Sequence, residues 1–212
     1  MDYEAKIYDA AWTRQAIAQI DEANSQDPNT ITIDGEARPE ALCYGEWMTA
    51  WVEKIRTTGS TNDMLLIAAR AQHIRRWEMP RSDFPDNRKG YLEWRNRLGE
   101  FHGECTGEIL KAIGYEEEFI DQVAFRIQKK CLKTNWDSQT IEDAACLIFL
   151  EHYFDATLEK TGERKMIRIL QKTWVKMSEP GHQLALALDL DEGQRSLIED
   201  ALGGEVGAES AS

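Results

Sequence analysis

Apolar residues recur along most of the chain at the three- and four-residue spacing of helices with one buried face. The first such stripe begins at Tyr8 and continues through Trp12, Ala16 and Ile20, and the second follows Pro39. Further helices are predicted over 64–77, 91–113, 115–132, 141–158, 164–177 and 191–203. Residues 30–33, TITI, are the one candidate strand. The pattern therefore predicts an all-α fold of about eight helices.

Glycine, proline and small polar residues separate the predicted helices and suggest where they begin and end. Ser60 or Asn62 is a candidate N-cap for the helix over 64–77, which Pro80 ends, and Gly114 is placed to end the helix over 91–113. The stretch AACLIFL within 141–158 is apolar on all sides, which is typical of a buried central helix. We expect one compact helical domain over 1–190, a short C-terminal helix over 191–203 and a disordered tail over 204–212.

Composition narrows the functional classes. A formal net charge of −13 argues against binding to nucleic acid or to anionic lipid, both of which need a basic surface. No run of 18 apolar residues is present, so we expect no membrane-spanning helix. The polar first residues do not resemble a signal peptide, and the four cysteines stand singly in apolar settings. We therefore expect a reduced, cytoplasmic protein, and the sequence indicates no oligomeric state.

Two short stretches interrupt this acidic background. The first basic segment, 70–97, and the second basic segment, 126–133, each carry a net charge of +4. If the fold brings them together, they would form one pocket for a phosphate or carboxylate group, which arginine binds through its planar fork. Alternatively, the cations pair with neighbouring acids on solvated faces. The candidate ligand-binding residues are Arg70, Arg75, Arg76, Arg81, Trp77, Lys129 and Lys130.

Three of the four histidines, His73, His102 and His152, lie in or beside predicted helices. His73 ends one helix, His102 is the second residue of the stretch FHGECTGEIL, and Asp143 lies near the start of the buried helix. Taken singly, each has a structural interpretation, as a hydrogen-bonded core histidine or as a charge at a helix N-terminus. Taken together, imidazole and carboxylate groups suit a divalent metal such as iron, manganese or zinc. Glu78 and Glu104 are candidates for the acid or base of a reaction at such a site.

Four stretches carry a resemblance to a known family: AARAQHIRRWEMPRSDFP, GYLEWR, FHGECTGEILKAIGYEEE and QTIEDAACLIFLEHYF. They are similar to a bacterial and fungal family known as domain of unknown function 4202, over nearly the whole chain to about Leu190. The family implies no activity. The same stretches show a weaker likeness to the HD-domain superfamily of all-α phosphohydrolases and di-iron oxygenases. That likeness implies that His73, His102 and Asp143 are metal ligands.

The chain departs from the HD-domain pattern at several positions. Ile74 stands where the signature aspartate is expected, and only Tyr44 or Glu46 is available where an early histidine is expected. A later histidine is expected at a position where the chain has Lys129 and Lys130. The metal site is therefore either rebuilt with Glu78, Glu104 or Glu151, or lost.

Three functions remain open, and binding to structured RNA is a fourth that the net charge opposes. The first is a metal-dependent enzyme, an HD-like hydrolase or oxygenase, that acts on a small phosphorylated or carboxylated substrate. The second is a metal-free binding module for an anionic metabolite or nucleotide. The third is a protein-interaction domain that uses the amphipathic helix over 164–177.

Overall fold

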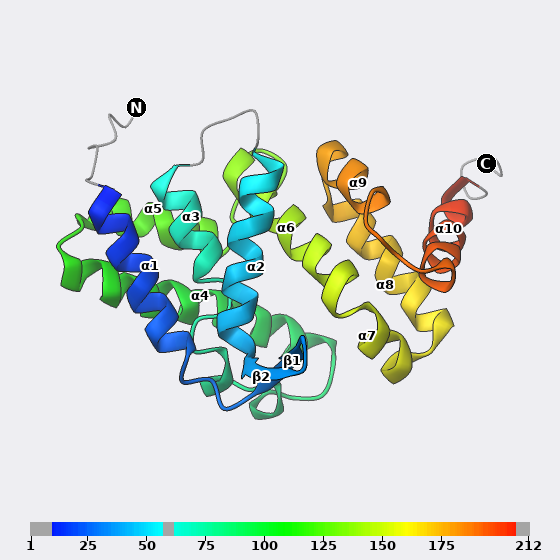
Figure 1. Cartoon of the computed structure of the whole chain (residues 1–212), viewed down its shortest axis with the longest axis horizontal. Coiled ribbons are helices and arrows are strands. Elements are labelled where there is room, and N and C mark those ends of the chain that lie inside the picture. The colour runs from blue at the N-terminus through cyan, green and yellow to red at the C-terminus, as the bar shows by residue number, and fades with distance from the viewer. Residues whose placement is uncertain (1–9, 57–61, 207–212) are drawn as a thin grey trace. The chain divides into compact units, whose positions relative to one another are not determined.

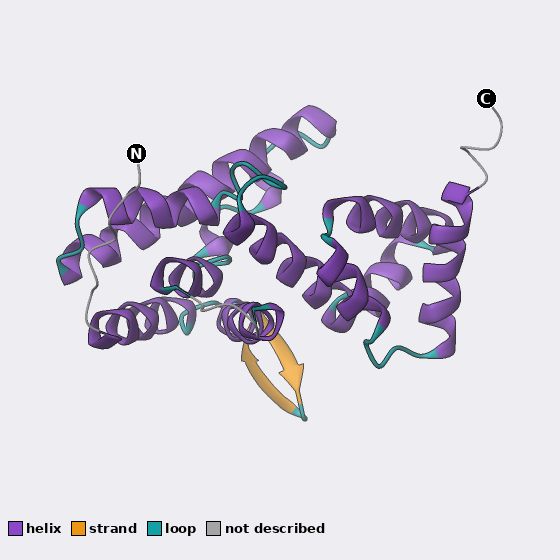
Figure 2. Cartoon of the chain, turned by 90° about the horizontal axis from the view of Figure 1, so that it is seen from above, coloured by secondary structure: helices purple, strands orange, loops and turns teal. Residues whose placement is uncertain are grey.

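The structure, a computed structural model of the chain, describes residues 10–56 and 62–206, with side chains up to residue 203. Most of these residues are helical, and the β-structure among them is a two-stranded hairpin, coloured orange in Figure 2. The predicted all-α class is thus confirmed in its main feature. None of the helices in this part of the chain is long and apolar enough to cross a membrane.

The chain forms two compact units, residues 1–141 and 142–212, and the helix α6 runs through the boundary. Unit 1 contains most of the elements shown in Figure 1. They are α1 (Ala10–Asn24), β1 (Thr30–Ile33), β2 (Glu36–Pro39), α2 (Glu40–Ile55), α3 (Asp63–Arg70), the 3-10 helices η1 (Arg76–Glu78) and η2 (Arg81–Asp83), α4 (Arg88–Ile113), α5 (Glu117–Ile127) and the start of α6 (Trp136–His152).

Asparagine caps and a glycine set several of these boundaries. The side chain of Asn62 accepts a hydrogen bond from the Leu65 amide at the start of α3, and Asn87 begins α4 in the same way. Gly114 ends α4 in the left-handed conformation, with φ of 109°. The caps predicted at Asn62 and Gly114 are confirmed, whereas Tyr8 and Ser60 lie outside the described residues.

The predicted helix over 64–77 is wrong beyond Arg70, where α3 ends. Turns follow, and Arg75 adopts the left-handed conformation, with φ of 51°. Distant side chains satisfy the backbone groups that a continued helix would have used. The Arg75 amide donates to Asn24 Oδ1, and the Ile74 carbonyl oxygen lies 2.7 Å from His102 Nδ1. These contacts redirect the chain after Ala71.

The sequence TITI does form a strand. It pairs antiparallel with β2, so that Thr30 lies opposite Pro39 and Ile33 opposite Glu36. Asp34 and Gly35 make the two-residue turn, both with positive φ, as tight hairpins require. Figure 2 shows the hairpin extending away from the helices.

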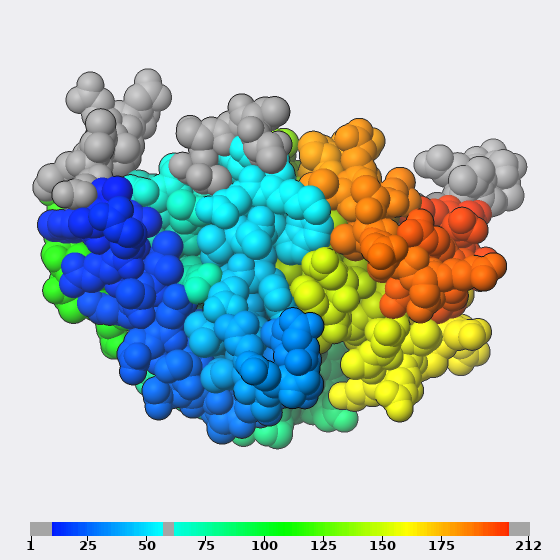
Figure 3. All heavy atoms as spheres, in the orientation of Figure 1, coloured from blue at the N-terminus to red at the C-terminus, as the bar shows by residue number. Residues whose placement is uncertain are grey.

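Helix packing in unit 1 places α3 against α1, α2 and α5, while α4 packs against α5. α2 and α3 approach closely because Gly45 has no side chain, and a Cβ there would lie 2.7 Å from the Arg70 carbonyl oxygen. The side chains of Ile20, Met48 and Leu65 are fully buried in this core. Figure 3 shows α1 and α2 forming much of the surface of unit 1 on the face in view.

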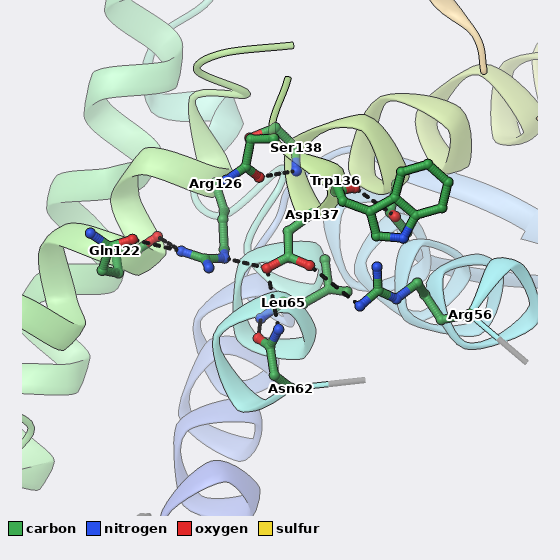
Figure 4. Close-up of polar contacts among 10 residues, drawn as sticks. Arg56, Asn62, Leu65, Gln122, Arg126, Trp136, Asp137 and Ser138 are labelled. Carbon is green, nitrogen blue, oxygen red and sulfur yellow. Dashed lines mark hydrogen bonds and ion pairs between the residues drawn. The ribbon is translucent and has the colours of Figure 1, made fainter. Parts of the chain in front are cut away.

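Asp137 connects the start of α6 to three other helices of unit 1 (Figure 4). Its carboxylate accepts hydrogen bonds from Arg126 Nε at 2.8 Å and from Asn62 Nδ2 at 3.2 Å, and Arg56 lies 3.7 Å away. Only 11% of the Asp137 side chain is exposed, and both arginines are similarly covered. The carboxylate therefore neutralises buried positive charge and fixes the end of α5, from which the second basic segment continues.

The described part of unit 2, up to residue 206, consists of the rest of α6 and four further helices. They are α7 (Phe154–Thr161), α8 (Glu163–Lys176), α9 (Glu179–Leu186) and α10 (Glu192–Val206). The helix predicted over 141–158 begins earlier, at Trp136, and breaks at Tyr153 between α6 and α7. α10 includes 204–206 of the predicted tail, and 207–212 lie outside the described residues.

Candidate functional site

A pocket of about 390 Å³ lies beside His73, within unit 1. Its walls come from the segment before the hairpin, the start of α2, the turns after α3, and α4. We call it the His73 pocket, and it is lined by Asp27, Pro28, Asn29, Glu40, Ala41, His73, Arg76, Trp77, Met79, Pro80, Arg81 and Trp94. Four of the candidate site residues therefore line one cavity: His73, Arg76, Trp77 and Arg81.

The turn η1 presents Arg76 and Trp77 to the pocket. The residue before it and its last residue are linked, because Arg75 Nε and Nη2 each donate a 2.7 Å hydrogen bond to the carboxylate of Glu78. The left-handed conformation of Arg75 starts the turn, and Asn24 Oδ1 accepts from its amide. Arg75 and Glu78 thus act as a clamp around the two residues that line the pocket.

Trp94 of α4 also supports this turn. Its indole Nε1 donates to the Met79 carbonyl oxygen at 3.0 Å, and its ring is buried. The guanidinium carbon of Arg76 lies 5.0 Å from the centroid of that ring, a cation–π distance. Trp94 therefore positions Arg76.

His73 is held flat against Tyr44. The two rings stack with centroids 3.5 Å apart and an interplanar angle of 10°. Next to His73 along the chain, Gln72 is buried, and its Nε2 donates to the Ile127 carbonyl oxygen at 3.3 Å. This hydrogen bond joins the turn after α3 to the end of α5. It therefore brings the first and second basic segments together.

Positive charge accumulates around His73. Burial lowers its pKa well below the usual value, and Arg76, His102, Lys129 and Arg95 lower it further, in that order. Arg76 and Arg95 belong to the first basic segment and Lys129 to the second. His73 is therefore neutral at pH 7 in a region of positive charge, in which Arg76 lines the pocket and Arg95 and Lys129 do not. Such a region stabilises an anion by Coulomb attraction.

His102 lies near His73, with ring centroids 6.3 Å apart. Its Nδ1 lies 2.7 Å from the Ile74 carbonyl oxygen, which can only accept, so Nδ1 carries the proton of the neutral ring. Burial lowers the pKa of His102 to about 3; Ile74 opposes this shift and Arg76 adds to it. The buried Nε2 is then an acceptor, and it has no hydrogen-bond partner among the described residues.

The other candidate cations have different positions. Arg70 forms a two-pronged ion pair with Asp21, and Arg75 is held by Glu78. Arg81 lines the pocket, but its Nη1 and Nη2 donate to the carbonyl oxygens of Phe84 and Pro85. Lys130 is exposed at the surface and does not line the pocket.

The candidate acid–base residues lie elsewhere in unit 1. Glu78 is engaged with Arg75, and Glu104 is exposed on α4; neither lines the His73 pocket. The carboxylates that do line it are Asp27 and Glu40, which sequence reasoning missed. Asp27 shapes the wall, because it accepts from the amides of Asn29 and Ala41. The sequence Asp27-Pro28-Asn29 is a typical turn signal, and it could have indicated that Asp27 shapes a turn.

Asp143, the third predicted metal ligand, belongs to unit 2. Its carboxylate accepts hydrogen bonds from the amide and the hydroxyl of Ser178, the N-cap residue of α9. Within residues 10–56 and 62–203, no three His, Cys, Asp or Glu side chains are grouped as a metal site requires. The predicted iron, manganese or zinc ion is not tested by this geometry and stays a prediction.

The chain belongs to the family described as domain of unknown function DUF4202, whose model matches residues 14–198. No curated protein and no solved structure matches the chain. The match includes every residue of the His73 pocket.

Proposed function

We propose that the protein binds a small phosphorylated or carboxylated metabolite in the His73 pocket. The observation that carries the proposal is that Arg76 lines the pocket beside His73, a neutral ring whose surroundings Arg95 and Lys129 make more positive without lining the pocket themselves. The protein as a whole is strongly acidic, so this local concentration of cations contrasts with its surroundings. Acidic surroundings disfavour polyanions through long-range repulsion, whereas a small anion senses mainly the nearby cations.

The supports of the pocket fit the same proposal. The buried indole of Trp94, which donates to the Met79 carbonyl oxygen, holds the turn that carries Arg76, and the exposed pair of Arg75 and Glu78 adds a weaker support. A preorganised cation loses little conformational entropy on binding, which favours affinity for a small ligand.

Thermal unfolding in phosphate tests the proposal. At a phosphate concentration 100 times the Kd, binding stabilises the folded state by about 2.7 kcal/mol, which corresponds to a rise of several degrees in Tm. We expect Arg76→Gln to remove most of that rise. Arg97→Gln is the matched control, because Arg97 lies on exposed α4 surface, pairs with Glu100 and does not line the pocket. Chloride at equal ionic strength gives the baseline, and an equal rise in both variants would refute the proposed site.

A second candidate function is the metal-dependent, HD-like hydrolase or oxygenase. One observation favours it: His102 directs its Nδ1 to a backbone carbonyl and leaves Nε2 as a buried acceptor. Histidines that bind metals commonly have this arrangement. The cations around His73 oppose it, because they repel a metal ion.

Elemental analysis of protein purified without chelator separates the two functions. The metal-dependent enzyme predicts near-stoichiometric iron, manganese or zinc that is lost in His102→Gln. Phosphate-dependent stabilisation of metal-free protein supports the binding function instead.

A further inference from the structure

The His73 pocket is larger than an inorganic oxyanion requires. Its volume of about 390 Å³ lies within the range of about 300–1,000 Å³ that is typical for sites of small organic molecules. The cations account for one part of its lining only. The ligand therefore carries more than a bare phosphate or carboxylate group.

Aromatic and apolar side chains make up another part of the lining. Trp77, Met79, Pro28 and Pro80 contribute to it. Trp77 differs from Trp94 in how its ring is used. The ring of Trp94 is buried, donates a hydrogen bond to the Met79 carbonyl oxygen and is in cation–π contact with Arg76. Trp77 is partly exposed, and its side chain forms no hydrogen bond or ring stack with other residues in the described ranges. Its indole face is thus a surface for a ligand within the pocket.

Trp77 and Arg76 are consecutive residues of one clamped turn. Both line the His73 pocket, so an aromatic surface and a cation are offered side by side at fixed spacing. Aromatic rings stack on tryptophan regardless of their substituents, because stacking needs only a π-face. A single ligand that has a ring close to its charged group can therefore contact both residues at once.

We propose that the ligand of the His73 pocket is an aromatic phosphate or carboxylate, whose planar ring stacks on Trp77 while its anionic group lies at Arg76 and His73. This inference rests on the proposed function and adds the chemical class of the ligand. Nucleotides and aryl phosphates share this chemistry.

Calorimetric titration with three probes tests the inference: phenyl phosphate, cyclohexyl phosphate and inorganic phosphate, at pH 8, where all three carry nearly full second charges. Cyclohexyl phosphate matches phenyl phosphate in charge and approximate size but has no π-face. We expect phenyl phosphate to bind at least about 5-fold tighter than cyclohexyl phosphate. Trp77→Leu should remove that preference, and Trp77→Phe, which keeps an aromatic ring, should retain it.

The outcomes separate this inference from the proposed function. Equal affinities for the two esters in the wild-type protein, or a preference that survives in Trp77→Leu, overturn the aromatic ligand while binding of inorganic phosphate still stands. If none of the three probes binds, both proposals fail. Unchanged binding of inorganic phosphate by Trp77→Leu establishes that the variant is folded and that its anion site is intact.

Discussion

Replacing Asp137 by alanine is expected to destabilise unit 1 strongly. The substitution removes the carboxylate that accepts from Arg126 and Asn62 and that lies near Arg56 (Figure 4). It leaves two arginines close together in a largely buried place. The side chains of Arg126 and Arg56 are only 12% and 13% exposed, so water does little to compensate for the lost negative charge.

The magnitude follows from this burial. Removing one partner of a buried ion pair costs about 3–5 kcal/mol, because the remaining charge is desolvated without a counter-charge. Arg126 keeps its hydrogen bonds to Gln122 through Nη1, which places the expected loss near the lower end, about 3 kcal/mol. Asp137→Asn keeps a side-chain acceptor but loses the charge, so we expect a smaller loss from it.

Urea unfolding, combined with hydrogen exchange of the α5 amides, measures this loss and locates it in unit 1. Glu100→Ala is the matched control, because Glu100 and Arg97 form an ion pair whose side chains are 46% and 53% exposed. Exposed pairs contribute less than about 1 kcal/mol. If Asp137→Ala and Glu100→Ala lower the free energy of unfolding equally, the central place given to Asp137 is wrong.

Three further predictions concern acid stability, close packing and capping. Burial lowers the pKa of His102 in the folded state to about 3, below its value in the unfolded chain. The neutral ring therefore contributes its full stability above pH 6.5, and this contribution is lost as the pH falls towards 3. His102→Gln should therefore flatten the pH dependence of the free energy of unfolding in that window, by on the order of 4 kcal/mol. Gly90→Ala should lower the Tm, because its Cβ would clash with the Pro85 carbonyl oxygen, whereas Gly203→Ala, which meets nothing, should not. Ser178→Ala should cost about 2 kcal/mol or more in chemical unfolding, since it removes both the cap of α9 and the hydroxyl that donates to the buried Asp143 carboxylate.

The main helices could be predicted from the sequence because each has a clear apolar stripe and recognisable ends. Gly114 and Asn62 are examples, since local conformation and local hydrogen bonding determine them. The end of α3 could not be predicted, because the contacts that redirect the chain come from Asn24 and His102, far away in sequence. The apolar periodicity of residues 64–77 contains no information about contacts with residues so distant in the sequence.

The same distinction between local and distant contacts applies to the pocket. The clustering of cations predicted an anion site, and the pairing of Arg75 with Glu78, three residues apart, is visible in the sequence. The pairing of Arg70 with Asp21, 49 residues away, is not. Nor does the sequence reveal that a buried glutamine, Gln72, joins the two basic segments by donating to a carbonyl oxygen of α5.

The most direct test of the anion site is a phosphate titration followed by NMR of the histidine rings. The chain has only four histidines, so the Cε1–H region of a ¹³C-correlated spectrum contains four signals, and a His73→Gln variant assigns one of them. We predict that phosphate shifts the His73 signal saturably and leaves those of His152 and His182, both in unit 2, unchanged. A titration that moves no histidine signal, or only those of unit 2, would contradict the account.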